Sequence, residues 1–339
     1  MSGRSLDRPR AIVRRARFFA KRHVPCPPLP RGSALSRTMT DKARSNSTFL
    51  LTLATLILTP SPSVAADRAT SSSQPNPFFA FCMDTHDAKK RSLQEQAELL
   101  KELGYDGVGH LWLDGVPERI KTLDAAGLKL FQIYLRVDVA PDAKQPFDPR
   151  LKEILPLLKG RDMVLAALVG GGKPSDEARD PRAVELLREI ADLAQPHGVK
   201  IALYPHTGDW LERVEDAQRV TKKVERPNVG VMFNFCHWLK VDDEKNLKPL
   251  LQAVRPHLFA VSLNGSDRGA DIRAGKGKWI VPLDEGEFDL LDLLKTLKEV
   301  GYTGPIGLQC WGIPGDAREH LTRSIAAWRK LNLRLGETK

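Results

Sequence analysis

The chain has 339 residues, of which 42% are hydrophobic, and a formal net charge of +10. Residues 1–38 hold ten basic residues and one acid, and residues 39–66 add two basic residues and one acid, so the rest of the chain carries no net charge. Because a protein that neutralises phosphates needs a basic surface, this neutral body argues against nucleic-acid binding. The composition is that of a globular protein with a substantial core.

The N-terminal region has the order of a targeting sequence. From Met39 the chain has a short charged start, an apolar run over 49–58, a Pro/Ser stretch and small residues that end at Ala66. This order is typical of a secretory signal peptide, and the apolar run is short for a membrane span. We predict a signal peptide over 39–66, with a retained membrane anchor as the alternative, and interpret 1–38 as a basic leader or a mispredicted start. The mature protein is then periplasmic or extracellular and not stably inserted in a membrane.

The rest of the chain alternates between two kinds of segment. After a Ser/Pro/Asn linker at 67–77, short apolar runs alternate with amphipathic stretches of helical period up to residue 334, and 335–339 form a tail. Apolar strands that alternate with helices predict a parallel sheet covered on its faces. Eight such units in roughly 260 residues predict an α/β fold of the TIM barrel type, with an open doubly wound sheet as the alternative. The predicted strands lie at 78–84, 107–113, 128–138, 163–171, 200–206, 229–237, 258–267 and 304–312.

Glycines mark the joints between these segments. Five of the predicted helices end at a glycine just before a strand, and glycine is the residue that a left-handed C-terminal cap prefers. The five glycines in this position are Gly104, Gly127, Gly160, Gly198 and Gly301.

Polar and aromatic residues gather at the carboxyl ends of the predicted strands, where TIM barrels carry their sites. Aromatic faces beside hydrogen-bonding edges suit a sugar ring and its hydroxyls, so we expect a carbohydrate ligand. His206 and His237, which can titrate near neutral pH, are the candidate catalytic residues. The candidate substrate-binding residues are His110, Trp112, Tyr134, Tyr204, Asn234, Trp238, Ser262, Asn264, Gln309 and Trp311.

Three segments resemble one known family. The resemblance is carried by SLQEQAELLKELGYDGVGH near the start of the predicted barrel, VGVMFNFCHWLK in its middle and PLDEGEFDLLDLLKTLKEVGYTGPIGLQCWG at its end. These segments resemble the xylose isomerase-like TIM barrels, a superfamily of sugar isomerases, ketose epimerases and AP endonuclease family 2. The resemblance covers about residues 78–334 and implies the same fold.

The resemblance also implies a metal site, at which this sequence departs from the family. Family members hold a divalent metal such as Mn, Mg or Zn with a glutamate on strand 5, an aspartate on strand 6, a histidine on strand 7 and a glutamate on strand 8. The matching positions here are Tyr204, Asn234, Ser262 and Gln309. Hard cations are held by anionic oxygens, so we expect no conventional metal site and no carboxylate acid–base pair.

One alternative metal site stays open at this point. Imidazole is a good ligand for Zn²⁺, so a displaced site is conceivable if several of the strand-end histidines converge. The histidines that we consider for it are His86, His110, His206 and His237.

Two functions are compatible with these residues. The first is an exported sugar isomerase or epimerase with a degenerate metal site, in which His206 or His237 supplies the proton chemistry. The second is a non-catalytic carbohydrate-binding barrel, in which Trp112, Trp238 and Trp311 stack on sugar rings. The family favours an enzyme and the missing carboxylates favour a binder. The neutral body disfavours a DNA enzyme of the AP endonuclease kind.

Overall fold

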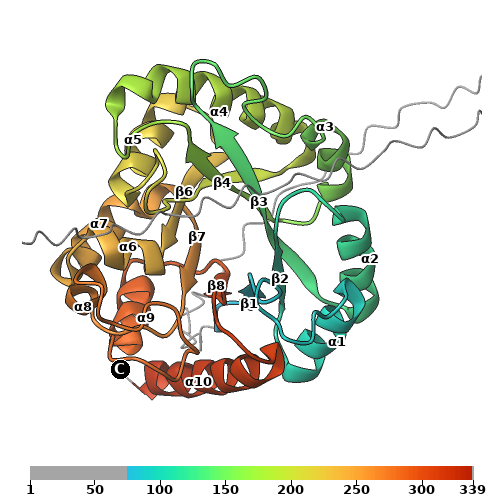
Figure 1. Cartoon of the computed structure of the whole chain (residues 1–339), viewed down its shortest axis with the longest axis vertical. Coiled ribbons are helices and arrows are strands. Elements are labelled where there is room, and N and C mark those ends of the chain that lie inside the picture. Colours follow the sequence, from blue (N-terminus) through green and yellow to red (C-terminus); the bar gives the residue numbers. More distant parts are fainter. Residues whose placement is uncertain (1–74, 338–339) are drawn as a thin grey trace, which may run out of the picture. The chain divides into compact units, whose positions relative to one another are not determined.

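The computed structural model describes residues 75–337, which form a closed barrel of eight parallel strands wrapped by helices (Figure 1). The strands pair in chain order, and the last strand closes the barrel on the first, with Phe81 opposite Gln309. This closure confirms the predicted TIM barrel and excludes the open sheet. The strands are β1 (Phe78–Phe81), β2 (Gly107–His110), β3 (Lys129–Asp138), β4 (Val164–Gly170), β5 (Lys200–Leu203), β6 (Val229–Asn234), β7 (Leu258–Leu263) and β8 (Ile306–Gln309).

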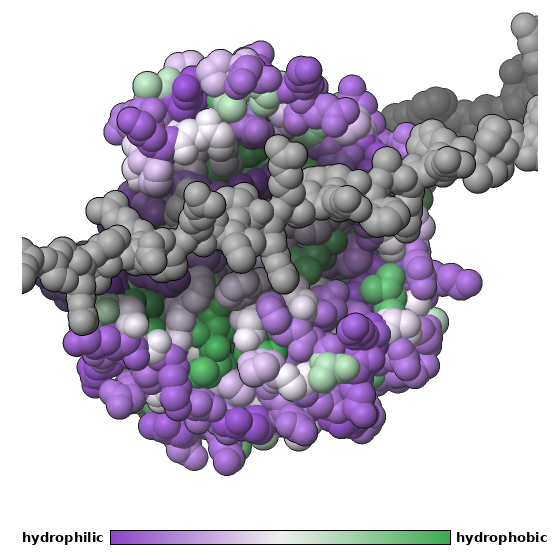
Figure 2. Space-filling model, in the orientation of Figure 1, coloured by the Kyte–Doolittle hydropathy of each residue, from purple (hydrophilic) through white to green (hydrophobic). Residues whose placement is uncertain are grey.

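Helices follow the strands and cover the outside of the barrel. Figure 2 shows hydrophilic residues over these outer helices and hydrophobic residues nearer the middle of the same face. Within residues 75–337 no helix combines the length and the apolarity that crossing a bilayer requires. The helices are α1 (Leu93–Leu103), α2 (Val116–Ala126), α3 (Leu151–Ile154), α4 (Asp180–Ala194), α5 (Val214–Val224), α6 (Phe235–Val241), α7 (Leu247–Val254), α8 (Gly269–Arg273), α9 (Leu290–Glu299) and α10 (Ala317–Glu337).

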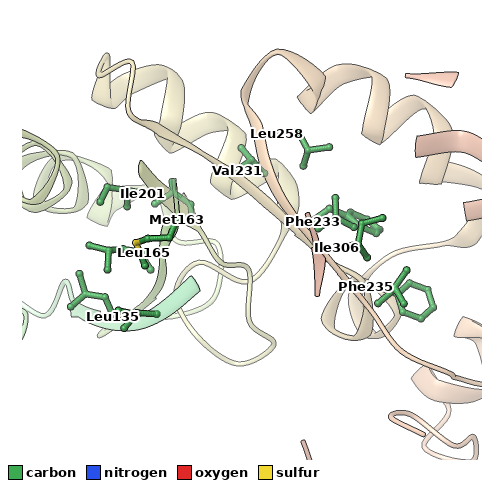
Figure 3. Packing of buried hydrophobic residues seen from close by; sticks show 14 of the residues in the cluster. Leu135, Met163, Leu165, Ile201, Val231, Phe233, Phe235, Leu258 and Ile306 are labelled. Atoms are coloured by element: carbon green, nitrogen blue, oxygen red, sulfur yellow. The ribbon is translucent and has the colours of Figure 1, made fainter. Parts of the chain in front are cut away.

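The strands are apolar on both faces because each face packs against side chains. Alternate residues of a strand point to opposite sides, so Phe79 and Phe81 fill the barrel interior while Phe78 packs outward. Figure 3 shows part of the outer layer, where Leu165 of β4 lies beside Ile201 of β5. The interior is therefore a packed core, which leaves the carboxyl end of the barrel as the place for a site.

The predicted helix caps are confirmed. Gly104, Gly127, Gly160, Gly198 and Gly301 all have φ between 67° and 83°, the left-handed conformation that a residue with a Cβ adopts only with strain. Each lies shortly before a strand, so each cap returns the chain from a helix to the barrel.

Most of the strands end earlier than the sequence predicted, although β3 ends at Asp138 as expected. β1 ends at Phe81 and β5 at Leu203, and Cys82, next after β1, already has φ of 56°. Hydrogen bonding between strands stops where the chain turns at the mouth of the barrel, so several polar residues placed on strand ends lie instead in loops. At the other end of the domain, α10 continues to Glu337, past the predicted boundary at 334.

Several predictions concern residues outside the described part of the chain. These are the basic leader at 1–38, the signal peptide at 39–66, most of the linker at 67–77 and the last two residues of the tail. The end of the linker is described: the Asn76 side-chain amide donates to the carbonyl of Gly304 at 2.8 Å, and the carbonyl of Pro77 accepts from the Ile306 amide at 2.8 Å. These bonds join the start of the domain to β8.

Candidate functional site

A cavity of about 380 Å³ lies at the carboxyl end of the barrel. Sites for small molecules have volumes of roughly 300 to 1,000 Å³, so the cavity can hold a small ligand. Five aromatic residues lie in its wall: Trp112, Tyr134, Tyr204, Trp279 and Trp311. Trp112 and Trp311 are 42% and 49% exposed, which places them at the rim rather than at the bottom.

Two of the positions at which the family carries metal ligands lie in the wall of the cavity. The Tyr204 hydroxyl accepts hydrogen bonds from the Tyr134 hydroxyl at 3.0 Å and from Nε2 of Gln309 at 3.3 Å. The Oε1 atom of Gln309 accepts from the backbone amide of Trp311 at 3.0 Å. Both the nitrogen and the oxygen of the Gln309 side-chain amide therefore form hydrogen bonds to protein atoms.

The other two positions are buried beyond the cavity wall. Asn234 of β6 and Ser262 of β7 are register partners, so the Ser262 hydroxyl donates to Oδ1 of Asn234 at 3.0 Å. The Nδ2 atom of Asn234 donates to the carbonyl of Pro205 at 3.1 Å. Both side chains are fully buried and bonded to protein atoms, which removes them from direct contact with a ligand.

These four residues do not fit a divalent metal. None is a carboxylate or an imidazole, and the amide atoms of Asn234 and Gln309 already bond to the protein. Burial raises the pKa of Tyr204 well above its ordinary value, so its hydroxyl keeps its proton. Among residues 75–337 no three His, Cys, Asp or Glu side chains converge as metal ligands. The displaced histidine site is therefore not formed by the described residues.

The two candidate catalytic histidines lie against each other in the cavity wall. The rings of His206 and His237 have centroids 4.0 Å apart and an interplanar angle of 40°. His237 lies in the first turn of α6, and its Nδ1 accepts a hydrogen bond from the backbone amide of Thr207 at 3.1 Å. Because Nδ1 is an acceptor, the proton of the neutral ring is on Nε2.

The surroundings of His206 favour the opposite tautomer. A tight turn, in which Gly208 has φ of 87°, brings the carboxylate of Asp209 back to His206. Nδ1 of His206 has no hydrogen-bond partner among the described residues and lies 3.5 Å from Oδ2 of Asp209, whose charge favours a proton on Nδ1. Arg136 fixes this carboxylate with bonds of 2.7 and 3.0 Å. Nε2 of His206 is then a proton acceptor.

Both rings are neutral near pH 7. Burial lowers the pKa of His206, an effect that Asp209 opposes and Arg136 supports. Burial also lowers the pKa of His237, to well below its usual range, and repulsion from a protonated His206 and from the charge of Lys240 adds to this. Two adjacent neutral imidazoles, one with a free lone pair and one with an N–H, can accept a proton from a ligand and donate a hydrogen bond to it.

Trp238 does not line the cavity, although we expected it to bind substrate. Its ring is 2% exposed and packs against Phe233 and Phe235, with centroids 5.5 and 6.5 Å away. Its Nε1 donates to Oδ2 of Asp242 at 3.1 Å. The helical phase of α6 explains the difference, because Trp238 lies three residues after Phe235 and shares its inward face.

His110 and Asn264 also lie outside the cavity wall. Nε2 of His110 bonds to the carbonyl of Asp114 at 2.7 Å, and its Nδ1 accepts from Arg119 at 3.3 Å, so this histidine holds the loop between β2 and α2. Nδ2 of Asn264 donates to the carbonyl of Trp279 at 2.9 Å. Asn264 therefore positions a wall residue instead of forming the wall itself. Of the candidates, the cavity wall contains Trp112, Tyr134, Tyr204, His206, His237, Gln309 and Trp311.

Several residues at or beside the cavity were not among the candidates, and four of them bear on the histidines: Thr207, Asp209, Lys240 and Trp279. The Trp279 indole donates to the carbonyl of Cys236 at 2.5 Å, and its ring contacts Trp311 and His237, with centroids 6.3 and 5.2 Å away. The sequence contained a signal for Lys240, because it follows His237 by three residues and residues at this spacing share a face of a helix. The role of Thr207 and Asp209 depends on a turn that has no clear sequence signal.

Comparison with known proteins places this barrel among related ones. The model of the xylose isomerase-like TIM barrel family matches residues 152–331. The inosose isomerases of Bacillus velezensis and Bacillus subtilis are each 26% identical over 240 residues, which cover 64% of this chain and 83% and 84% of those proteins.

Solved structures share the fold at lower identity. A D-allulose 3-epimerase from Methylomonas sp. has a TM-score of 0.58 and 15% identity and covers 76% of this chain and 99% of its own. The IOLI protein, solved with a binding zinc atom, has a TM-score of 0.60 and 17% identity, with coverages of 76% and 99%. At such identities the likeness shows the fold alone.

Proposed function

Because the chain belongs to the family of xylose isomerase-like TIM barrels, we propose that it binds a sugar or keto-sugar and moves a proton on it without a metal. The sugar isomerases and epimerases among its relatives support this substrate class. The observation that carries the proposal is the contact between His206 and His237 in the cavity wall. These two rings supply an acceptor and a donor at the end of the barrel where the family carries its carboxylates.

The chemistry that this pair can perform is proton transfer beside a carbonyl group. Nε2 of His206 takes the proton from the carbon next to the carbonyl, and the electrons of that C–H bond form a C=C bond while the oxygen gains negative charge. The Nε2–H group of His237 stabilises that oxygen by a hydrogen bond. Return of the proton to the former carbonyl carbon, while the hydroxyl proton of the original carbon passes to the former carbonyl oxygen, gives isomerisation. Epimerisation requires the original carbon to receive a proton on its opposite face from a second donor such as water. A positioned acid or base of this kind contributes roughly 10² to 10⁴-fold in rate.

The aromatic wall suits the body of such a substrate. Trp112 and Trp311 at the rim, with Trp279 between the rim and His237, present ring faces and edges to the cavity. The apolar C–H face of a sugar ring packs on such surfaces, while its hydroxyls bond to the histidines and to nearby hydroxyl groups.

The alternative is a barrel that binds carbohydrate without turnover. The closed hydrogen-bond network of Tyr204, Asn234, Ser262 and Gln309 favours it, because these residues occupy the places of the family's metal ligands and contain no carboxylate. In that case the two histidines would act only as hydrogen-bonding partners for the ligand.

Deuterium exchange separates these two functions. The full chain is incubated in D₂O with an inosose, D-allulose or D-tagatose, and NMR follows replacement of the hydrogen beside the carbonyl. We expect exchange by the wild type, strong loss in His206→Gln and His237→Gln, and full exchange in the control His257→Gln, which changes a residue just before β7 at the other end of the barrel. Binding without exchange would support the non-catalytic barrel, and the absence of both would refute the proposal.

We also propose that the protein acts outside the cytoplasm. The support is the signal-peptide order of residues 39–66, with its small residues ending at Ala66. N-terminal sequencing of the protein purified from its native cells tests this, and we expect the mature chain to begin close to Asp67. A chain that keeps the apolar run over 49–58 would argue for a retained anchor instead.

A further inference from the structure

Lys240 places a positive charge in the wall of the cavity, and no carboxylate lines the cavity to offset it. Lys240 forms no ion pair with any residue in the described range. It is half-buried at the end of α6. A charge in such a place has lost part of its hydration without gaining an anionic protein partner, so a negatively charged group of a ligand can pair with it.

The position of this ammonium group is well defined. Lys240 follows His237 by three residues on α6, so the two side chains lie on the same face of the helix. Its Nζ lies 3.3 Å from the centroid of the Trp279 ring, a cation–π contact. That ring is itself fixed, by the bond from its indole to the carbonyl of Cys236 and by the bond from Asn264 to its own carbonyl.

The charge of Lys240 also acts on the two histidines. It contributes to lowering the pKa of both His206 and His237, so its field reaches the proton-transfer pair. Arg136, the other cation nearby, makes two hydrogen bonds to the carboxylate of Asp209 and is neutralised by it. With both rings neutral, the cavity presents a single positive charge to its ligand.

We propose that the ligand of this cavity is an anionic sugar whose carboxylate pairs with Lys240 while its ring packs against the tryptophans. This inference rests on the proposed sugar site and names its substrate class: a uronate or a related sugar acid. One lysine matches the single charge of a carboxylate. A phosphate group, with close to two negative charges at neutral pH, is usually held by several donors or a bidentate arginine, and the cavity wall contains no arginine.

Binding measurements with matched sugars test this inference. Tryptophan fluorescence or calorimetry with the full chain compares D-glucuronate with D-glucose and D-galacturonate with D-galactose, and D-glucose 6-phosphate forms a separate arm. We expect at least one uronate to bind on the order of tenfold to a hundredfold more tightly than its neutral counterpart, the range of one charge-assisted hydrogen bond. The preference should weaken as the salt concentration rises.

Two variants and a control assign the preference to Lys240. Lys240→Gln should remove the uronate preference, measured as the ratio of the affinities for the uronate and for its neutral counterpart, whereas Lys240→Arg should keep it. The control is Lys245→Gln, which removes an exposed lysine five residues further along the chain. Thermal unfolding of each variant shows whether the fold is retained, and the arginine variant keeps the test valid if the glutamine variant does not fold.

The outcomes separate this inference from the proposed function. Neutral sugars that bind as tightly as the uronates, or a uronate preference that survives in Lys240→Gln, would overturn the inference while leaving the sugar site intact. Tighter binding of the phosphorylated sugar would overturn the carboxylate assignment. If none of the sugars binds, both the inference and the proposed sugar site fail.

Discussion

The rings of His206 and His237 lie 4.0 Å apart, although one follows β5 and the other lies in α6. They meet because β5 and β6 are neighbours in the barrel, so the segments after the two strands leave its carboxyl end side by side. The turn at Gly208 and Asp209 and the amide of Thr207 then favour opposite tautomers for the two rings. The barrel thus brings two imidazoles together in a cavity whose wall, as formed by the described residues, contains no carboxylate.

Asp209 is a positioning residue for His206, and its replacement should change the pH profile of proton exchange. Asp209 raises the pKa of His206, so Asp209→Asn should lower it further and weaken the base. We expect the exchange rate at pH 7 to fall about tenfold or more, a part of the general-base contribution, and the acidic limb of the rate profile to move to lower pH. A lower rate with an unmoved acidic limb would indicate a purely structural role.

Removal of metal should leave the protein unaffected. The four positions that match the family's ligands hold neutral side chains bonded to the protein, so we expect EDTA treatment to change neither deuterium exchange nor the thermal unfolding temperature. Elemental analysis before and after growth with added Mn, Zn, Co and Mg is the companion measurement. Activity that is lost with EDTA and restored by one of these metals would contradict the metal-independent mechanism.

Restoring the family's aspartate by Asn234→Asp should destabilise the fold. Nδ2 of Asn234 donates to the carbonyl of Pro205, and the side chain is fully buried, so the change puts a carboxylate oxygen against a carbonyl oxygen. We expect a loss of about 1 to 3 kcal/mol or more in the free energy of unfolding, measured by urea denaturation at pH 7. A variant as stable as the wild type would show that the surroundings of Asn234 tolerate a charge.

Two tryptophans that the sequence could not distinguish should respond differently to truncation. Trp311 is 49% exposed at the rim, so Trp311→Ala should weaken sugar binding by roughly tenfold and change the free energy of unfolding by less than about 0.5 kcal/mol. Trp238 is 2% exposed in the core, so Trp238→Ala should cost about 3 to 5 kcal/mol in stability. Denaturation and fluorescence titration measure both quantities, and a stable Trp238→Ala variant with impaired binding would reverse this assignment.

This pair shows where prediction from the sequence ends. The barrel could be predicted, because eight apolar strands, helical segments and the glycine caps all point to one architecture. The end of the barrel that carries the cavity followed from the fold. The direction of each side chain could not be predicted from the sequence. Because α6 begins immediately after β6, the phase of this helix decides which side chains face the cavity. It turns His237 and Lys240 to the cavity and Trp238 to the core. Asn264 likewise follows a strand at the correct end of the barrel, but it bonds to the backbone of Trp279 and does not line the cavity.

His320 should make the stability of the fold depend on pH. It lies in α10, is 5% exposed, and its Nδ1 has no hydrogen-bond partner among the described residues. Burial lowers its pKa from 6.5 to about 4, so between these values the unfolded chain takes up a proton that the folded chain does not. Stability should therefore fall as the pH drops from 7 to 5, and His320 should account for about 2 kcal/mol of that fall.

Urea denaturation at pH 7 and pH 5 of the wild type and of His320→Gln measures this contribution. We expect the variant to lose about 2 kcal/mol less than the wild type over this interval, because glutamine cannot take up a proton in the unfolded chain. His257→Gln, at the amino end of the barrel, is the matched control. If the wild type and His320→Gln lose the same stability between these pH values, the folded protein protonates His320 as readily as the unfolded chain does. The packing of α10 around this ring would then have to open to water.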